Sequence, residues 1–377
     1  MRVMLILGTR PEAVKLAPVI SILREKADIF ETGVVITAQH REILDQILDI
    51  FAIQPDYDLN IMTKNQSLTR VAARCLQGLD KIIKKEKPDI VLVQGDTTTV
   101  FIAGLVCYYN KVRVGHVEAG LRTKDRFSPF PEEMNRRLLS SLADLHFAPT
   151  EWAKENLLRE GIPETKVFVT GNTVVDSLQT ILARPNNVPV IPPNIGDFIR
   201  SRSKIILVTA HRRESFGHPF EEMCRAMLDI ADRNPDLGII YPVHPNPNVR
   251  SKVFAILKES PRILLTEPMD YLSFVYLMKS AYIILTDSGG IQEEAPTLGK
   301  PVLIMREKTE RPEGIEAGIS RLVGTKRERI VSEVQLLLDS GTDYEKMVGK
   351  KNPFGDGKAS QRIADILIDY YGNNKLI

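Results

Sequence analysis

The segment Ile283–Glu294 has the composition of a phosphate-binding turn. A short β-branched run is followed by Asp-Ser-Gly-Gly and then by helix-forming residues, which predicts a strand, a tight turn and a helix N-terminus. Free N–H groups and the positive dipole end of such a terminus favour phosphate. Gly289 and Gly290 lack the Cβ atoms that would hold a diphosphate away. With Glu293 or Glu294 to accept from ribose hydroxyls, the segment predicts a nucleoside diphosphate site, although an ordinary strand–helix turn has the same composition.

Three carboxylates stand where proton transfer can use them: Asp96, Glu118 and Glu132. Asp96 and Glu118 each follow a predicted strand, and Glu132 opens a predicted helix. Burial and neighbouring charges at such places can shift the pKa of a carboxyl group toward the value that general acid–base catalysis needs. A structural role is the alternative, because Asp96 could cap a helix and Glu132 could favour a helix dipole.

Basic side chains accompany them at the ends of other predicted strands. Arg10 lies between Gly8-Thr9 and Pro11, which suits the first turn of a helix, and its guanidinium can fork onto a phosphate. Lys15 lies one turn further on. His211 and His244 each follow a strand directly, where an imidazole can bind a phosphate oxygen, protonate a leaving group or serve as a structural hydrogen-bonding residue.

A loop after the predicted strand Pro301–Met305 carries Arg311 and Glu316, and its Gly314 and Gly318 permit a bend. We expect this loop to close over a nucleotide sugar. The chain lacks both G-x-G-x-x-G after a strand and G-x-x-x-x-G-K-[ST], and no histidine pair has ligand spacing. We therefore expect no cofactor and no metal.

Composition narrows the class of protein. The 377 residues include 50 Lys and Arg against 48 Asp and Glu. The chain therefore lacks the clear excess of basic residues that is typical of nucleic-acid-binding proteins. Cys75, Cys107 and Cys224 lie far apart in the sequence. This spacing favours buried free thiols in a reducing compartment over disulfides. The N-terminal apolar run of five residues is too short for a signal peptide or a membrane span. We expect a cytoplasmic protein with no nucleic-acid or membrane partner.

Short apolar runs alternate with amphipathic segments along the chain, which predicts an α/β fold of doubly wound parallel sheets. The expected strands are Val3–Leu7, Val34–Thr37, Ile90–Gln94, Val112–Val117, Val167–Thr170, Ile205–Thr209, Ile239–Val243, Ile263–Leu265, Ile283–Thr286 and Pro301–Met305. The expected helices include Ala13–Lys26, Leu68–Lys85, Glu132–Ala143, Phe220–Asp232 and Lys358–Tyr371.

Proline-rich residues 183–203 indicate a linker, so we expect one domain over 1–185, a second over 186–357 and a terminal helix within 358–377. Ligands of open α/β sheets bind at the carboxyl ends of the strands. The polar motifs after the strands of both halves therefore predict one cleft between two domains.

These motifs together resemble the non-hydrolysing UDP-N-acetylglucosamine 2-epimerases nearly end to end. The resemblance rests on G-T-R-P-E-A-V-K-L-A-P (8–18), V-Q-G-D-T-T-T (93–99), G-H-V-E-A-G-L-R-T (115–123), P-F-P-E-E-M-N-R (129–136), T-A-H-R-R-E (209–214), T-D-S-G-G-I-Q-E-E-A-P (286–296) and E-R-P-E-G-I-E-A-G (310–318). It implies two Rossmann-like domains in the GT-B arrangement with an inter-domain cleft, a C-terminal helix that returns to the first domain, homodimers and no cofactor.

The chemistry that the resemblance implies is reversible inversion of C2 between UDP-GlcNAc and UDP-ManNAc. It proceeds by anti elimination of UDP to a 2-acetamidoglucal and re-addition, and it supplies ManNAc for cell-surface polysaccharide. Which carboxyl group removes the C2 proton and which returns it stays open. The implied catalytic residues are Asp96, Glu118, Glu132 and His211. The implied substrate-binding residues are Arg10, Lys15, Arg136, His211, Ser288, Gly289, Gly290, Glu294 and Arg311.

Three other functions remain open from the sequence. A hydrolysing epimerase would release ManNAc and UDP, but its relatives differ around the first loop and the Glu118 segment. A GT-B glycosyltransferase would need an acceptor groove and no set of three carboxylates. A nucleotide-sugar sensor would turn nothing over.

The resemblance also implies a second UDP-GlcNAc site that activates bacterial members, matched here at Gln39, His40, Arg212, Glu214 and His244. Two positions depart: Glu42 and Asn65 stand where those members carry Gln and Arg. An added acid and a lost arginine both weaken binding of an anionic diphosphate. We therefore expect weakened or altered activation, measured as initial velocity against UDP-GlcNAc concentration. A strongly sigmoidal curve would contradict it.

Overall fold

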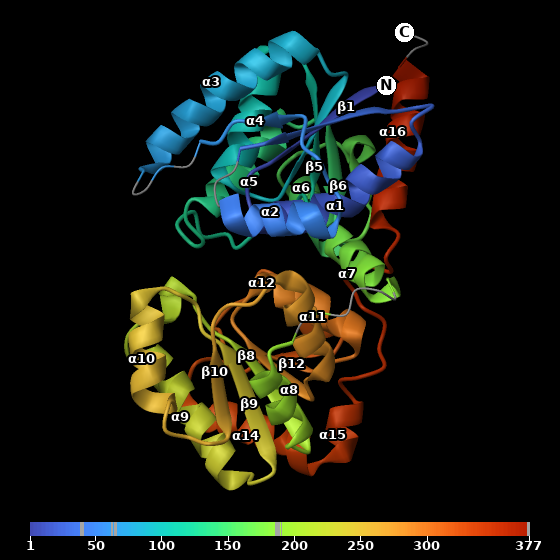
Figure 1. The fold of residues 1–377 in the computed structure, drawn as a ribbon. Coiled ribbons are helices and arrows are strands. Elements are labelled where there is room, and N and C mark those ends of the chain that lie inside the picture. The colour runs from blue at the N-terminus through green and yellow to red at the C-terminus, as the bar shows by residue number, and fades with distance from the viewer. Residues whose placement is uncertain (38–40, 62, 64–65, 185–188, 190, 375–377) are drawn as a thin grey trace. The chain divides into compact units, whose positions relative to one another are not determined.

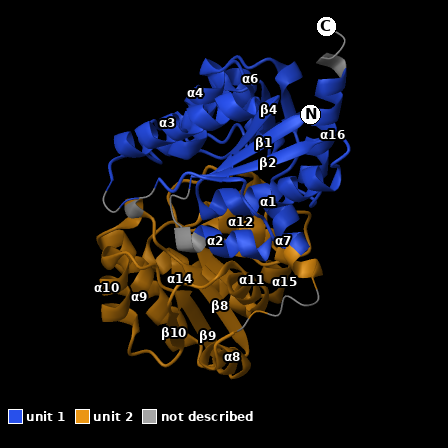
Figure 2. Ribbon diagram, turned by 45° about the horizontal axis from the view of Figure 1, so that its top comes forward, with its two compact units in different colours: residues 1–180, 354–377 blue, residues 181–353 orange. Residues whose placement is uncertain are grey.

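The computed structural model describes residues 1–37, 41–61, 63, 66–184, 189 and 191–374. They form two compact units, residues 1–180 with 354–377 and residues 181–353, shown in different colours in Figure 2. The chain therefore crosses from unit 1 to unit 2 and back. The two units are described separately, and the cleft expected between domains stays a prediction.

Unit 1 is built on a seven-stranded parallel sheet of order β3-β2-β1-β4-β5-β6-β7. Its strands are β1 (Arg2–Leu7), β2 (Glu31–Ile36), β3 (Tyr57–Asp58), β4 (Ile90–Gln94), β5 (Arg113–Val117), β6 (Leu145–Ala148) and β7 (Val167–Val169). Its helices are α1 (Arg10–Glu25), α2 (Arg41–Ile50), α3 (Leu68–Glu86), α4 (Thr98–Tyr109), α5 (Glu132–Leu142), α6 (Glu151–Arg159), η1 (Glu164–Lys166), most of α7 (Thr173–Ala183) and α16 (Ala359–Asn374).

Unit 2 repeats the plan with a six-stranded parallel sheet of order β10-β9-β8-β11-β12-β13. Its strands are β8 (Lys204–Thr209), β9 (Leu237–Pro242), β10 (Ile263–Thr266), β11 (Ile283–Thr286), β12 (Val302–Ile304) and β13 (Ser320–Leu322). Its helices are α8 (Pro193–Arg200), η2 (Arg213–Ser215), α9 (His218–Arg233), α10 (Pro247–Leu257), α11 (Tyr271–Ser280), α12 (Gly289–Glu294), η3 (Ala295–Leu298), α13 (Glu313–Glu316), α14 (Arg327–Asp339) and α15 (Gly341–Glu345).

The predicted fold class, two doubly wound Rossmann-like α/β units, is confirmed. All ten expected strands form, with ends shifted by up to three residues. The sequence missed β3, β6 and β13, which have only two to four residues each. The expectation of a linker throughout 183–203 is wrong for 193–200, which form α8. Pro193 starts that helix because proline is tolerated in a first turn, and Ile195 anchors it by burial.

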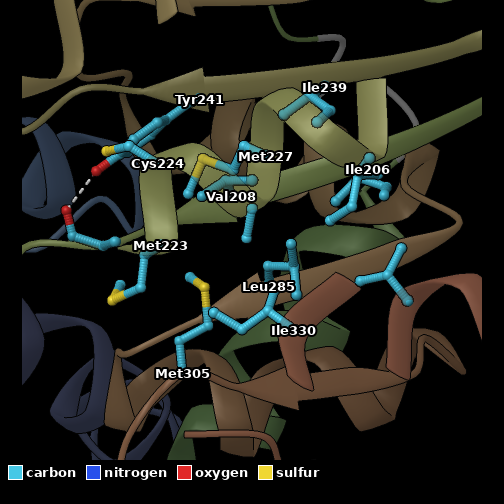
Figure 3. Packing of buried hydrophobic residues seen from close by; sticks show 14 of the residues in the cluster. Ile206, Val208, Met223, Cys224, Met227, Ile239, Tyr241, Leu285, Met305 and Ile330 are labelled. Atoms are coloured by element: carbon cyan, nitrogen blue, oxygen red, sulfur yellow. Dashed lines mark hydrogen bonds between the residues drawn. The ribbon is translucent and has the colours of Figure 1, made fainter. Parts of the chain in front are cut away.

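The core of unit 2 shows how the sheet is held (Figure 3). Ile206 and Val208 of β8 and Leu285 of β11 pack with methionines of α9. Tyr241 of β9 is also fully buried, and its hydroxyl donates to the carbonyl oxygen of Ala210 at 2.6 Å. This bond satisfies a polar atom inside the core and fixes the backbone just after β8.

The return of the chain to unit 1 ends in α16, which packs against α1 (Figure 1). Asp176 of α7 caps the first turn of α16. Its carboxylate accepts from the backbone N–H of Ser360 at 2.8 Å and of Ala359 at 3.3 Å. A carboxylate in this position satisfies free donors and complements the helix dipole.

We expect Asp176→Ala to weaken the first turn of α16 by about 1 kcal/mol, as loss of a capping carboxylate does. Backbone amides near Ser360 should then exchange with solvent about fivefold faster, measured by hydrogen exchange and mass spectrometry. Asp365→Ala, on the exposed face of the same helix, is the control and should leave exchange near Ser360 unchanged. Equal protection in wild type and Asp176→Ala would contradict a capping role.

Candidate active site

Both sheets reverse their strand order at one point, between β1 and β4 in unit 1 and between β8 and β11 in unit 2. Polar loops that follow neighbouring parallel strands diverge at such a switch point and leave room for a ligand. The residues singled out by sequence lie in these loops or in the helices that follow them: Arg10 and Lys15 after β1, Asp96 after β4, Glu118 after β5, Glu132 and Arg136 in α5, His211 after β8, His244 after β9, Ser288, Gly289, Gly290 and Glu294 after β11 and Arg311 after β12.

Glu118 is the centre of one cluster in unit 1. Its buried carboxylate pairs with the Lys15 ammonium and accepts from the side-chain amides of Gln94 at 2.9 Å and Asn172 at 3.4 Å. The backbone of Glu118 has φ +63°, a conformation that costs a non-glycine residue about 1 kcal/mol or more and that clusters at functional sites. Three side chains from different segments, Lys15, Gln94 and Asn172, thus hold the residue in a specific, strained geometry.

Asp96 forms a second cluster with the first two turns of α5. The Arg136 guanidinium binds the Asp96 carboxylate at 2.6 Å and reaches Glu133 at 3.4 Å. Asn135 donates to the Asp96 carbonyl oxygen at 2.8 Å. Because α5 begins at Glu132, that half-buried side chain shares the same helical end.

His116 of β5 hydrogen-bonds to the loop that carries Asp96. Its Nε2 lies 2.8 Å from the carbonyl oxygen of Gly95. Burial lowers the pKa of His116 to about 3 and that of His146, paired with it on β6, to about 4. Both rings are therefore neutral at physiological pH, and His116 carries its proton on Nε2 as a donor to Gly95.

The sequence missed several members of these clusters: Glu12, Gln94, Glu133, Asn135 and Asn172. A signal was present for two of them. Gln94 is the last residue of β4 and Asn172 follows β7 closely, so both obey the strand-end rule that selected the other residues. For the other three, only packing shows that the side chain points into the cluster.

Asp287 organises the equivalent loops in unit 2. Its carboxylate is fully buried and accepts from the backbone N–H of His211 at 2.6 Å and of Arg212 at 2.7 Å. The Nδ1 atom of His211 lies 3.4 Å from the same carboxylate. The turn after β8 is therefore tied to the turn after β11, and the His211 side chain remains 37% exposed.

Three of the second-site residues named above lie near this turn. The rings of His211 and His244 stack at 5.2 Å, and desolvation together with His211 lowers the pKa of His244. Arg212 adjoins His211, and Glu214 binds Arg306 at 2.7 Å. Gln39, His40 and Asn65 and the side chain of Glu42 lie outside the described residues.

The Gly-rich turn of the sequence forms the start of α12, with Ser288 as its N-cap and Gly289 and Gly290 as its first residues. Glu294 lies one turn further on, and its carboxylate accepts from the Tyr271 hydroxyl at 2.9 Å. Strand, turn and helix thus occur in the predicted order.

Arg311 packs against the first residue of this helix, Gly289. Its guanidinium is buried and binds Glu293 at 2.6 Å and Glu310 at 2.7 Å. A Cβ atom added to Gly289 would meet the Arg311 guanidinium at 2.6 Å. The glycine is required here because a charged group, itself held by two carboxylates, packs against its backbone.

Among the residues that the structure describes, no three His, Cys, Asp or Glu side chains are grouped as metal ligands. In the same part of the chain, every helix is too short or too polar to span a bilayer.

Comparison with known proteins adds independent findings. The sequence model of the family described as UDP-N-acetylglucosamine 2-epimerase matches residues 23–368. The UDP-N-acetylglucosamine 2-epimerase of Yersinia pestis is 53% identical over 97% of this chain and 98% of its own length. That of Salmonella typhimurium is 53% identical over 98% of this chain and 99% of its own. The crystal structure of UDP-GlcNAc 2-epimerase from Neisseria meningitidis bound to UDP-GlcNAc has a TM-score of 0.91 at 47% identity, covering 98% of this chain and 100% of that one.

The two glycines of α12 allow a matched test. We expect Gly289→Ala to destabilise unit 2 by about 1–3 kcal/mol, because the new methyl group must displace a tightly paired guanidinium. In Gly290→Ala the methyl group would meet only Glu294 Oε1, at 3.6 Å, and should cost nothing or stabilise slightly through helix propensity. Thermal unfolding measures both variants, and equal melting temperatures would refute the packing argument.

Proposed function

Since the chain belongs to the UDP-N-acetylglucosamine 2-epimerase family, we propose that it interconverts UDP-GlcNAc and UDP-ManNAc by the non-hydrolysing route. In this route the C1–O bond to UDP breaks and C2 loses its proton, which leaves 2-acetamidoglucal and UDP. UDP then adds back to C1 while C2 receives a proton on its other face. The atoms balance without water and without a redox cofactor.

The observation that carries this proposal is the pair of carboxylate clusters in unit 1. Loss and return of the C2 proton on opposite faces require more than one carboxyl group. Glu118 is held by Lys15, Gln94 and Asn172, whereas Asp96 is held by Arg136. The two groups lie on different loops, as proton transfer on opposite faces of the sugar ring requires. Glu132, at the start of α5, is the third candidate.

We propose that unit 2 binds the UDP moiety. The backbone N–H groups from Ser288 to Gly290 would donate to the diphosphate, and Glu294, steadied by Tyr271, would accept from the ribose hydroxyls. His211, fixed by Asp287, would stabilise charge on the leaving UDP. Arg311, which packs against Gly289, is a further substrate-binding residue of the proposal.

On the side of unit 1, we propose that Arg10, the first residue of α1, meets the same anionic leaving group. Neutralising the departing diphosphate is what makes C1–O cleavage possible, because the C2 proton becomes acidic only as positive charge builds at C1. We also propose that the protein is a homodimer, as the family resemblance implies. We propose a cytoplasmic location because the three buried free thiols suit a reducing compartment.

The first test is proton NMR of the purified protein with UDP-GlcNAc in D2O, without acceptor or nicotinamide. We expect UDP-ManNAc to appear and deuterium to enter C2 of both epimers. Free ManNAc with UDP as sole products would instead identify a hydrolysing enzyme. An unchanged spectrum would contradict the proposal and favour a transferase or a sensor. Glu118→Gln should slow exchange at C2 by about 100-fold or more, as loss of a proton-transfer group does, and the exposed control Glu164→Gln should not.

A further inference from the structure

His116, on β5, is a fully buried histidine that no step of the proposed reaction uses. Its Nε2 atom lies 2.8 Å from the carbonyl oxygen of Gly95. A carbonyl oxygen can only accept a hydrogen bond, so Nε2 carries the ring proton and donates it to this bond. Gly95 directly precedes Asp96 in the chain. The imidazole therefore joins β5 to the turn that presents the Asp96 carboxylate.

The two peptide groups that flank the Cα atom of Asp96 are both held by side chains. The group before it is held through the Gly95 carbonyl oxygen by His116. The group after it is held through the Asp96 carbonyl oxygen by the Asn135 amide, at 2.8 Å. Peptide groups are planar, so fixing both of them fixes the direction of the Cα–Cβ bond between them. The Asp96 carboxylate, which pairs with Arg136 at 2.6 Å, can then reach only a small region.

The backbone of Gly95 makes the turn dependent on such partners. Its φ of +83° turns the chain out of β4, and a Cβ atom added there would meet nothing within 4 Å. The glycine is thus required by its conformation and not by lack of space, and no side chain restricts its backbone. Its N–H donates to the Val117 carbonyl oxygen at 3.1 Å, and its own carbonyl oxygen accepts from His116. The imidazole therefore holds a peptide group that is otherwise easy to rotate.

Stability of the fold does not account for a histidine at this place. The Nδ1 atom of His116 is shielded from solvent and has no hydrogen-bond partner in the part of the chain that the structure describes. An apolar side chain would avoid the cost of burying that unpaired atom. His146 lies beside His116 in register on β6 and is equally buried, and neither of its ring nitrogens has a hydrogen-bond partner among the described residues. The bond to Gly95 is what distinguishes His116 from this neighbour.

We propose that His116 is a positioning residue for the reaction: its hydrogen bond to Gly95 sets the direction in which Asp96 presents its carboxylate. The inference rests on the proposed function, in which Asp96 takes part in proton transfer at C2. It requires no contact between His116 and substrate and no proton transfer by the ring. Because burial lowers the pKa of His116 to about 3, the ring stays neutral at neutral pH.

The experiment compares wild type with three substitutions of His116. The amide nitrogen in His116→Gln stands as many bonds from Cα as Nε2 does, so it can still donate to Gly95. The amide in His116→Asn stands where Nδ1 does, and His116→Leu has no donor. We expect kcat for UDP-GlcNAc epimerisation to fall by about tenfold or more in His116→Asn and His116→Leu, with a smaller change in KM, because a displaced reacting group slows the chemical step. His116→Gln should keep most of the wild-type kcat.

His146→Leu is the matched control. It removes an equally buried imidazole from the adjacent strand and leaves the bond from His116 to Gly95 in place. Its kcat should match wild type, whereas its melting temperature should change by about as much as that of His116→Leu. A general disturbance of β5, which also leads to Glu118, would not distinguish His116→Gln from His116→Asn.

Each contrary outcome has a definite meaning. Wild-type kcat in His116→Asn and His116→Leu would overturn the inference and leave the proposed function intact. Equal losses of kcat in His116→Gln and His116→Asn, or a loss in His146→Leu as large as that in His116→Leu, would also overturn it. If a substitution by leucine prevents folding, the contrast between His116→Gln and His116→Asn decides, and failure of all three His116 substitutions to fold would make His116 a core residue. A wild-type protein that does not epimerise would overturn the proposed function itself.

Discussion

Parallel pairing of strands is the constraint on which both units depend. It places the carboxyl ends of all strands of a sheet at one edge, and the reversals of order between β1 and β4 and between β8 and β11 open that edge at a single point. Residues far apart in the chain, such as Lys15 and Glu118 or His211 and Asp287, become neighbours there. The chemistry of the molecule is a consequence of where these loops are forced to meet.

Each unit ties together the loops at the point where its strand order reverses. At each reversal, two loops must keep a fixed separation although neither has secondary structure. In unit 1 the hydroxyls of Thr37, which follows β2, and Thr99, in α4, bond to each other at 3.0 Å beside Gly8, which follows β1. In unit 2 the Asp287 carboxylate binds the N–H groups of His211 and Arg212 across the gap between β8 and β11. A buried carboxylate suits this task because it accepts several hydrogen bonds at once.

Buried charge is costly unless it is paired, and the pairing pattern therefore distinguishes support from reactivity. Arg311 is enclosed by Glu293 and Glu310 and acts on the turn that it packs against. Glu118 also has a cationic partner, but it stands at a strained backbone position at the end of a strand. Within each unit, ion pairs of this kind give the side chains that they include a fixed orientation.

The sequence by itself determined the fold class, most of the strands and the identity of the loops that carry chemistry, because hydrophobic runs and strand-end polar residues are local signals. Asp96, Glu118, His211 and Ser288 were found in this way. Only the tertiary structure decided which side chains hold Asp96 and Glu118, and that the Arg311 guanidinium packs against Gly289. It also decided that residues 193–200 form a helix. Burial and direction depend on contacts between segments distant in sequence, and no local pattern records them.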